Sequence, residues 1–119
     1  MSDHSLEQLR QQINTFVQTR DWEQFHSPKN LAMALIGEAA EIIEHFQWLT
    51  PEESYQLPPD KQQAVSHELA DVFIYLIRLA DKLGIDLIAV TNEKMKINEA
   101  RYPVELVKGS ARRASEYKT

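Results

Sequence analysis

The sequence predicts an all-α fold, and three observations predict it. Glycines and prolines are few, three and five in 119 residues, so long stretches carry no helix breaker. Apolar residues recur at three- and four-residue steps, the spacing of one helix face. No run alternates apolar and polar residues for long enough to predict a strand. The 43% hydrophobic content is enough for one core. We expect one domain over residues 1–108 and a polar tail over 109–119.

The first two helices are marked by apolar spacing and by a cap. The first is expected over residues 5–19, where one apolar stripe contains Leu6, Leu9, Ile13, Phe16 and Val17. Ser27 followed by Pro28 predicts an N-cap and the first position of a second helix, which should end near Trp48. Residues 51–60 should then form a loop with at most one helical turn, because Pro58 and Pro59 cannot continue a helix.

The third helix is expected over residues 61–83, with Gly84 as its stop, and Asp86 should cap a fourth helix that ends at Tyr102 and Pro103. The fourth should bury Leu87, Ile88, Val90, Met95 and Ile97. The third is apolar around much of its circumference, which predicts a four-to-five-helix bundle completed by a second copy of the chain. A central helix fully buried within a monomer is the alternative.

Charge and composition narrow the class of protein. A net charge of −5 argues against binding to duplex nucleic acid, which needs many Lys and Arg contacts to phosphates. There is no cysteine, residues 1–10 lack the apolar segment of a signal peptide, and no run is long enough to span a bilayer. We therefore expect a soluble cytoplasmic protein that binds neither nucleic acid nor membrane.

Acidic residues interrupt the apolar faces of the second and third helices. Glu38 shares a row with Leu31, Leu35 and Ile42, while Glu41 and Glu44 follow at three-residue steps. Glu68 and Asp71 repeat this spacing on the third helix. Two carboxylates about 4 Å apart repel by roughly 4 kcal/mol at an effective dielectric of about 20, so something must compensate.

A divalent cation is the simplest compensation, because residues 30–50 contain no Lys or Arg. Ligands that are all oxygen favour Mg²⁺, with Mn²⁺ as the second candidate. A di-iron site would need Glu-x-x-His pairs, which neither helix contains. Gly37 adds to the case, since a glycine inside a helix usually implies close approach by a ligand or another helix. The alternative is that these acids are solvated surface residues.

Five segments carry a family resemblance: DWEQFH at 21–26, GEAAE at 37–41, FQW at 46–48, ELADV at 68–72 and RYPV at 101–104. With them the sequence resembles the all-α nucleoside triphosphate pyrophosphatases of the MazG-like group, especially the dCTP pyrophosphatase branch. The resemblance implies that Glu38, Glu41, Glu68 and Asp71 bind Mg²⁺. It also implies dimers or tetramers, and hydrolysis between the α- and β-phosphates.

The resemblance further implies a nucleotide pocket formed by Trp22, His26, Trp48, Tyr75 and Asn98, with Lys94 and Arg101 near the phosphates. Ile13 departs from the pattern, because the animal dCTP enzymes are expected to place a base-contacting histidine there. The two tryptophans could instead be core residues, and His26 a capping or packing residue. Lys94 and Arg101 could be ordinary surface charges.

The predicted function is Mg²⁺-dependent hydrolysis of dCTP-like or modified pyrimidine nucleoside triphosphates, a house-cleaning activity on the nucleotide pool. Glu41 or Glu44 is the predicted group that orients or deprotonates the attacking water. A non-enzymatic helical dimerisation module with an acidic partner-binding face is the first alternative. A phosphohydrolase acting on another phosphorylated metabolite is the second.

Overall fold

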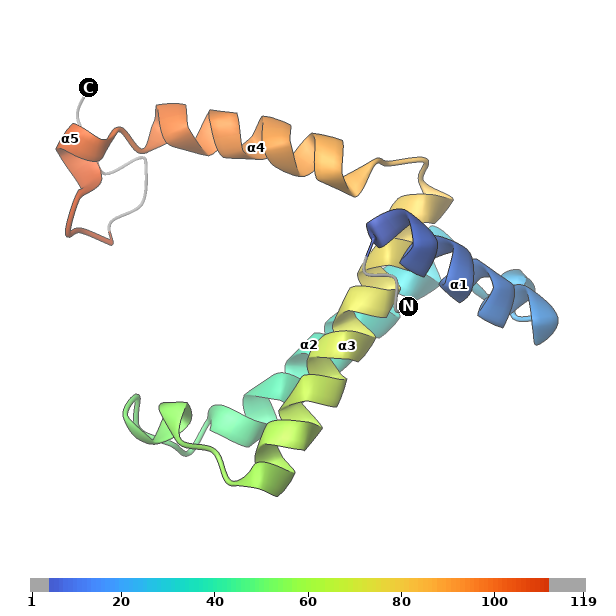
Figure 1. Cartoon of the computed structure of the whole chain (residues 1–119), viewed down its shortest axis with the longest axis horizontal. Coiled ribbons are helices and arrows are strands. Elements are labelled where there is room, and N and C mark those ends of the chain that lie inside the picture. The colour runs from blue at the N-terminus through green and yellow to red at the C-terminus, as the bar shows by residue number, and fades with distance from the viewer. Residues whose placement is uncertain (1–4, 112–119) are drawn as a thin grey trace. The chain divides into compact units, whose positions relative to one another are not determined.

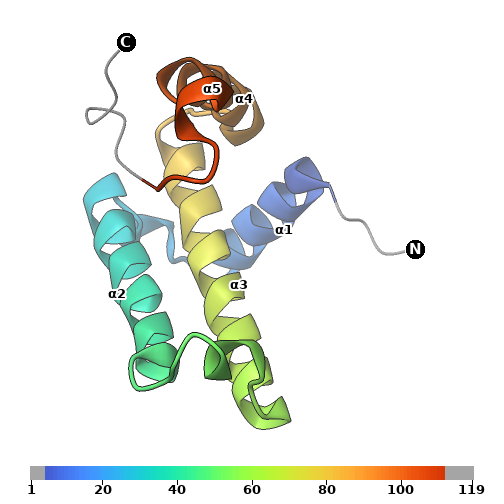
Figure 2. The same cartoon turned by 90° about the vertical axis from the view of Figure 1, so that its left-hand side faces the viewer.

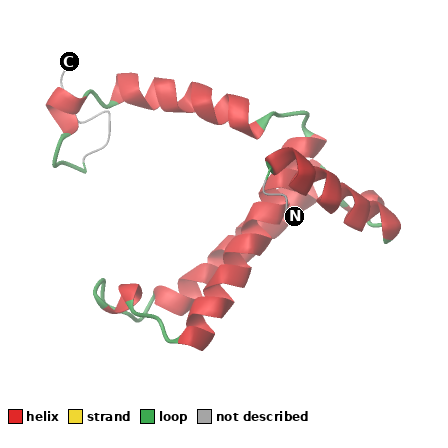
Figure 3. Ribbon diagram, in the orientation of Figure 1, coloured by secondary structure: helices red, strands yellow, loops and turns green. Residues whose placement is uncertain are grey.

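The computed structural model describes residues 5–111, and in this range all regular structure is helical, without a strand (Figure 3). The predicted all-α class is therefore confirmed. The chain divides into two compact units, the first ending at Ile85 and the second starting at Asp86. Each unit is described by itself.

Helix α1 (Leu6–Thr19) begins and ends with defined caps. The Ser5 hydroxyl accepts a hydrogen bond from the backbone N–H of Gln8 at 3.1 Å. At the other end Asp21 takes a positive φ of 53°, and the N–H of Trp22 donates to the carbonyl of Val17 at 3.0 Å. This is the Schellman arrangement, with aspartate where glycine is usual. It turns the chain sharply into the short 3₁₀ helix η1 (Glu23–Phe25).

Helices α2 (Pro28–Phe46) and α3 (Pro59–Lys82) follow the predicted punctuation, with the 3₁₀ helix η2 (Glu53–Tyr55) between them. Ser27 caps α2, which ends two residues before Trp48. Helix α3 starts earlier than predicted because Pro59 occupies its first turn, where a missing N–H costs nothing. Gly84 ends α3 with a φ of 67°, as predicted.

The first unit is built around α3. Helix α2 lies alongside it and runs in the opposite direction, and α1 contacts its C-terminal half (Figures 1 and 2). The apolar core is small and consists of Ile13, Val17, Leu31, Val65, Ile77 and Ala80. On α3, Phe73, Ile74 and Leu76 stay exposed. Within the first unit by itself α3 is therefore not fully buried, and both its burial by the rest of the chain and assembly with a second copy stay predictions.

The second unit holds α4 (Leu87–Arg101) and the short α5 (Val104–Val107). Asp86 caps α4 as predicted, accepting from the N–H of Ala89 at 3.1 Å. The predicted buried side of α4 is wrong: none of its residues is buried, and Ile88 is 59% exposed. One helix and a single turn are too little to form a core of their own.

The domain boundary and a search for membrane-spanning helices complete the description of the chain. The division into a domain over 1–108 and a tail over 109–119 stays a prediction, and most of that tail lies outside the described residues. Within residues 5–111, no helix has both the length and the apolar character that a bilayer crossing requires.

Candidate functional site

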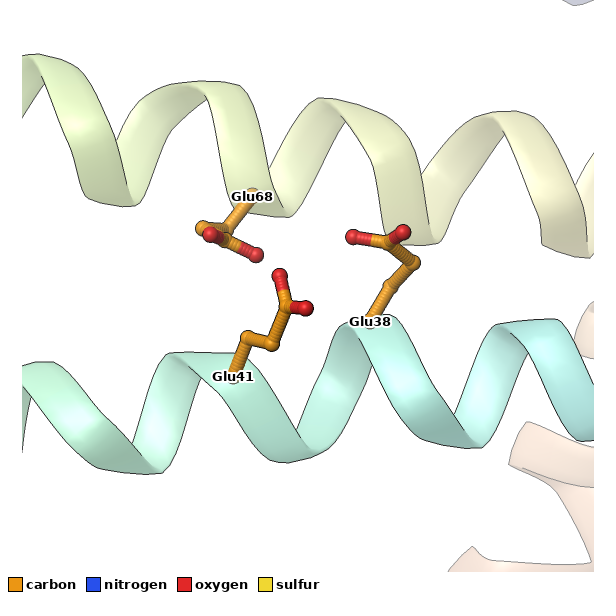
Figure 4. A group of neighbouring side chains, drawn as sticks. All are labelled: Glu38, Glu41 and Glu68. Carbon is orange, nitrogen blue, oxygen red and sulfur yellow. The ribbon is translucent and has the colours of Figure 1, made fainter.

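Three glutamates from two helices converge where α2 and α3 lie side by side. Glu38 and Glu41 extend from α2 toward α3, and Glu68 extends from α3 toward α2 (Figure 4). One carboxylate oxygen of each lies within 4.8 Å of the others. The three-residue step from Glu38 to Glu41 is one helical turn, so both reach the same face. We call Glu38, Glu41 and Glu68 the acidic cluster.

The acidic cluster has no internal compensation. Among residues 5–111, no ion pair includes one of its carboxylates, and Oε2 of Glu68 is buried without a hydrogen-bond partner. Burial, followed by a hydrogen bond with Glu41 and the neighbouring charges, raises the pKa of Glu68. Burial and the charge of Glu41 also raise the pKa of Glu38. The fold therefore leaves negative charge here that an external cation can satisfy.

The donor set fits a hard divalent cation. All candidate ligand atoms are carboxylate oxygens, which suit Mg²⁺ and Mn²⁺ better than softer metals. A cation at this point would supply the missing partner of Glu68 Oε2 and offset the repulsion among the three acids.

The other predicted members of the acidic site lie differently. Asp71 is exposed and outside the group of three, but it is close enough to raise the pKa of Glu38 and Glu68. Glu44 is exposed and also outside the group. The close approach of another helix expected at Gly37 is wrong for the described residues, because a Cβ placed there would meet nothing within 4 Å, whereas the approach of a ligand stays a prediction.

A cavity of about 320 Å³ lies between α1, η1 and α3, and Asp71 is part of its wall. Its aromatic wall is formed by Phe16, Trp22 and Tyr75. The rings of Phe16 and Trp22 meet edge to face, with centroids 5.7 Å apart. The volume falls within the range of small-molecule sites. Since Asp71 lies one turn after Glu68 on α3, the cavity begins next to the acidic cluster.

The structure brings together part of the predicted nucleotide pocket. Trp22, His26 and Tyr75 all line the cavity. Trp48 does not, and it is 86% exposed beyond the end of α2. The remaining three, Lys94, Asn98 and Arg101, lie on α4 in the second unit, so their proximity to the phosphates stays a prediction.

Arg78 is a cavity residue that the sequence reasoning missed. It is 2% exposed and donates hydrogen bonds to His26, Asn14 and Glu23. The available signal was an arginine set within the apolar run of α3, between Ile77 and Leu79. A charge in such a place is rarely buried unless it is paired.

Comparison with known proteins settles the family. Residues 35–116 match the MazG-like family. The chain belongs to the MazG-like family. The resemblance seen in the sequence is thus confirmed at the level of the family.

Two relatives named dCTP pyrophosphatase 1 are similar to nearly the whole of this chain. It is 45% identical to dCTP pyrophosphatase 1 of Mus musculus over 90% of its length and 43% identical to that of Homo sapiens over 94%. It covers only 64% of the mouse protein and 67% of the human one. It is also similar to a crystal structure of a pyrophosphatase from Archaeoglobus fulgidus, with a TM-score of 0.79 and 36% identity over 87% of this chain and 96% of that one.

Proposed function

We propose that this chain is a Mg²⁺-dependent nucleoside triphosphate pyrophosphohydrolase that releases a nucleoside monophosphate and pyrophosphate. One observation carries the proposal: an uncompensated acidic cluster lies beside an aromatic cavity, with Asp71 between them. The relatives named dCTP pyrophosphatase 1 and the pyrophosphatase of similar fold support the same reaction class.

In this proposal Glu38, Glu41 and Glu68 hold the metal ion, and Asp71 completes the ligand set from the cavity side. When bound, Mg²⁺ or Mn²⁺ supplies a Lewis acid for the phosphate oxygens and lowers the pKa of a water molecule. Among residues 5–111 the acidic cluster has no cationic partner. Its charge therefore makes binding of a triphosphate to an acidic protein depend on the metal ion.

Glu41 and Glu44 are the two candidates for orienting or deprotonating the attacking water. Glu41 belongs to the acidic cluster, whereas Glu44 lies one turn further along α2 and is exposed. A carboxylate outside the cluster keeps its lone pairs available for a proton. The shape of the pH profile of E44Q against that of E41Q separates the two roles.

The cavity is the proposed site for the base. Trp22, Phe16 and Tyr75 offer aromatic faces and edges, and stacking on such rings tolerates different bases. The proposed substrates are dCTP-like or modified pyrimidine deoxynucleoside triphosphates, consistent with the names of the relatives. The buried Ile13 adds an apolar wall at which the base finds no hydrogen-bond partner.

We also propose that the active form is a homodimer or homotetramer. Large apolar side chains stay exposed on both main helices of the first unit, among them Met33, Ile36, Ile43, Leu69 and Phe73. Exposed apolar surface of this extent is typical of protein interfaces. Trp48, Lys94, Asn98 and Arg101 keep their predicted roles in nucleotide binding as part of this proposal.

A nucleotide panel tests the reaction. Purified protein is incubated with dNTPs and NTPs, with Mg²⁺ or with EDTA, and the products are identified. We expect pyrophosphate and a monophosphate, only with metal, and the fastest turnover with pyrimidine deoxynucleotides. Orthophosphate would indicate cleavage at the γ-phosphate and contradict the proposal. Absence of any turnover, with thermal stability unaffected by Mg²⁺ and nucleotide, would favour the dimerisation module.

A further inference from the structure

Arg78 is held rigidly by three elements. Its Nη1 donates to Asn14 Oδ1 of α1 at 2.6 Å, its Nη2 to Glu23 Oε2 of η1 at 3.0 Å, and its Nε to Nδ1 of His26 at 3.3 Å. Asp81 adds an ion pair at 3.8 Å. Since a guanidinium is planar, contacts on both of its edges leave it no freedom to rotate.

The contact between Arg78 and His26 fixes where the imidazole carries its proton. A guanidinium stays protonated in proteins and can only donate hydrogen bonds. The ring nitrogen that faces it, Nδ1, must therefore accept and carry no proton. In a neutral imidazole the proton then belongs to Nε2.

The surroundings also keep His26 neutral. Burial comes first and the charge of Arg78 second in lowering the pKa of His26, with Lys82 acting in the same direction and Glu23 in the opposite one. Within residues 5–111, Nε2 of His26 has no hydrogen-bond partner, and it is not sealed from solvent. His26 lines the cavity, so its one N–H is available to a bound molecule.

We propose that Arg78 is a positioning residue: it holds His26 as the neutral Nε2–H tautomer, and the cavity thereby selects a base that presents a hydrogen-bond acceptor to this N–H. The acceptor class is a carbonyl oxygen or an unprotonated ring nitrogen, which a cytosine ring offers. The selection for a base rests on the proposed nucleotide function, whereas the tautomer does not.

Histidine NMR tests the tautomer on the protein alone. With ¹⁵N-labelled histidine, long-range correlations should show two widely separated ring nitrogen signals for His26, with Nε2 protonated. In R78M the signals should move toward each other as the tautomers exchange. The matched control is E23Q, which loses an ion pair of Arg78 but keeps the donor to His26, and it should retain the wild-type pattern. A protonated Nδ1 in the wild type, or an unchanged R78M spectrum, would overturn the proposal.

A second pair of variants works even if R78M fails to fold. In H26Q the side-chain amide can place its NH₂ near the position of Nε2, whereas in H26N the amide reaches only the position of Nδ1. Calorimetry with dCMP as the probe should show H26N weakening affinity by about tenfold more than H26Q, which is the size of one neutral hydrogen bond. Equal losses in both variants would contradict the use of the Nε2 donor.

Deoxyribose 5-phosphate, which has no base, separates this inference from the proposed function. H26N and H26Q should bind deoxyribose 5-phosphate with equal affinity. If the wild type binds dCMP but H26N and H26Q are equivalent, the selection fails while the nucleotide function stands. If the wild type binds no nucleotide although the His26 tautomer is fixed, the nucleotide function and the selection both fail, and the positioning by Arg78 alone is upheld.

Discussion

Glu68 and Arg78 are charged residues on the same helix, and the fold treats them in opposite ways. Arg78 is buried with partners from α1, η1 and α3. Glu68 has two acidic neighbours, and one of its oxygens is buried without a hydrogen-bond partner in the described part of the chain. A buried charge that is fully paired belongs to the scaffold, whereas an unpaired one is stable only when something external binds. The contrast separates the part of α3 that would position His26, around Arg78, from the part that would bind the metal ion, around Glu68.

Neutralising the acidic cluster should have the largest effect. In E41Q and E68Q, turnover should fall by at least about a hundredfold, because the metal ion stabilises the transition state by several kcal/mol. Circular dichroism should show an intact fold. The matched control is E52Q, an exposed acid in the loop after α2, which should keep its activity. Full activity in E41Q and E68Q would show that the cluster takes no part in the reaction.

Metal binding should stabilise the protein by an amount that depends on the cluster. At a hundredfold excess of Mg²⁺ over Kd, the free energy of unfolding should rise by about 2.7 kcal/mol. Differential scanning fluorimetry should show this as a higher Tm for the wild type and little change for E68Q. An equal rise in both proteins would place the stabilising ion elsewhere.

Changes in the aromatic wall of the cavity should have the next largest effect, a loss of nucleotide affinity. Removing one stacking partner in W22A should weaken nucleotide binding by about 1–3 kcal/mol, roughly five- to 150-fold in KM. The change in kcat should be smaller, since Trp22 is not a member of the acidic cluster. F25A provides the control, because Phe25 is exposed and does not line the cavity. Equal effects of both variants would contradict a base site at Trp22.

The contrast also predicts a dependence of stability on pH. The pKa values of Glu38 and Glu68 lie above the ordinary 4.5 in the fold, so the folded chain binds these protons more tightly than the unfolded one. Their contribution to stability is present below pH 4.5 and is lost as the pH rises through the raised values. In EDTA, the Tm of E68Q should therefore exceed that of the wild type at neutral pH. A lower Tm for E68Q there would contradict the uncompensated charge.

The smallest effect concerns the turn that precedes the cavity. Asp21 has positive φ and accepts a hydrogen bond from Gln24. We expect D21A to destabilise by about 1 kcal/mol, because alanine tolerates the left-handed region poorly. Glycine is at ease there, so D21G should stay within about 0.5 kcal/mol of the wild type. Urea unfolding measures both, and equal stability of D21A and D21G would show that the turn stores no strain.

The sequence predicted Glu68 but not Arg78, and the reason is physical. The acidic cluster follows from short-range helix geometry, since Glu38 and Glu41 lie one turn apart and a doubled acidic pattern interrupts two apolar faces. The helix ends were predictable for the same reason: Ser27, Gly84 and Asp86 act on their own neighbours. The surroundings of Arg78 come from Asn14, Glu23 and His26, which are 64, 55 and 52 residues away. No local pattern contains that information.

The prediction that α4 buries one of its sides was wrong for a related reason. Apolar spacing indicates which side of a helix prefers to be covered, but it does not identify what covers it. Among the described residues 86–111 of its own unit, α4 is accompanied only by the single turn of α5. The same limit applies to Phe73 and Ile74 of α3, whose side chains are also exposed.

A crystal structure with Mn²⁺ tests the central claim most directly. We predict an anomalous difference peak between α2 and α3, coordinated by oxygens of Glu38, Glu41 and Glu68, with Asp71 turned toward it. Oε2 of Glu68 should then be a ligand or the acceptor of a metal-bound water. Absence of a peak at this point at millimolar Mn²⁺, with the three carboxylates held instead by side chains of a second subunit, would contradict the account.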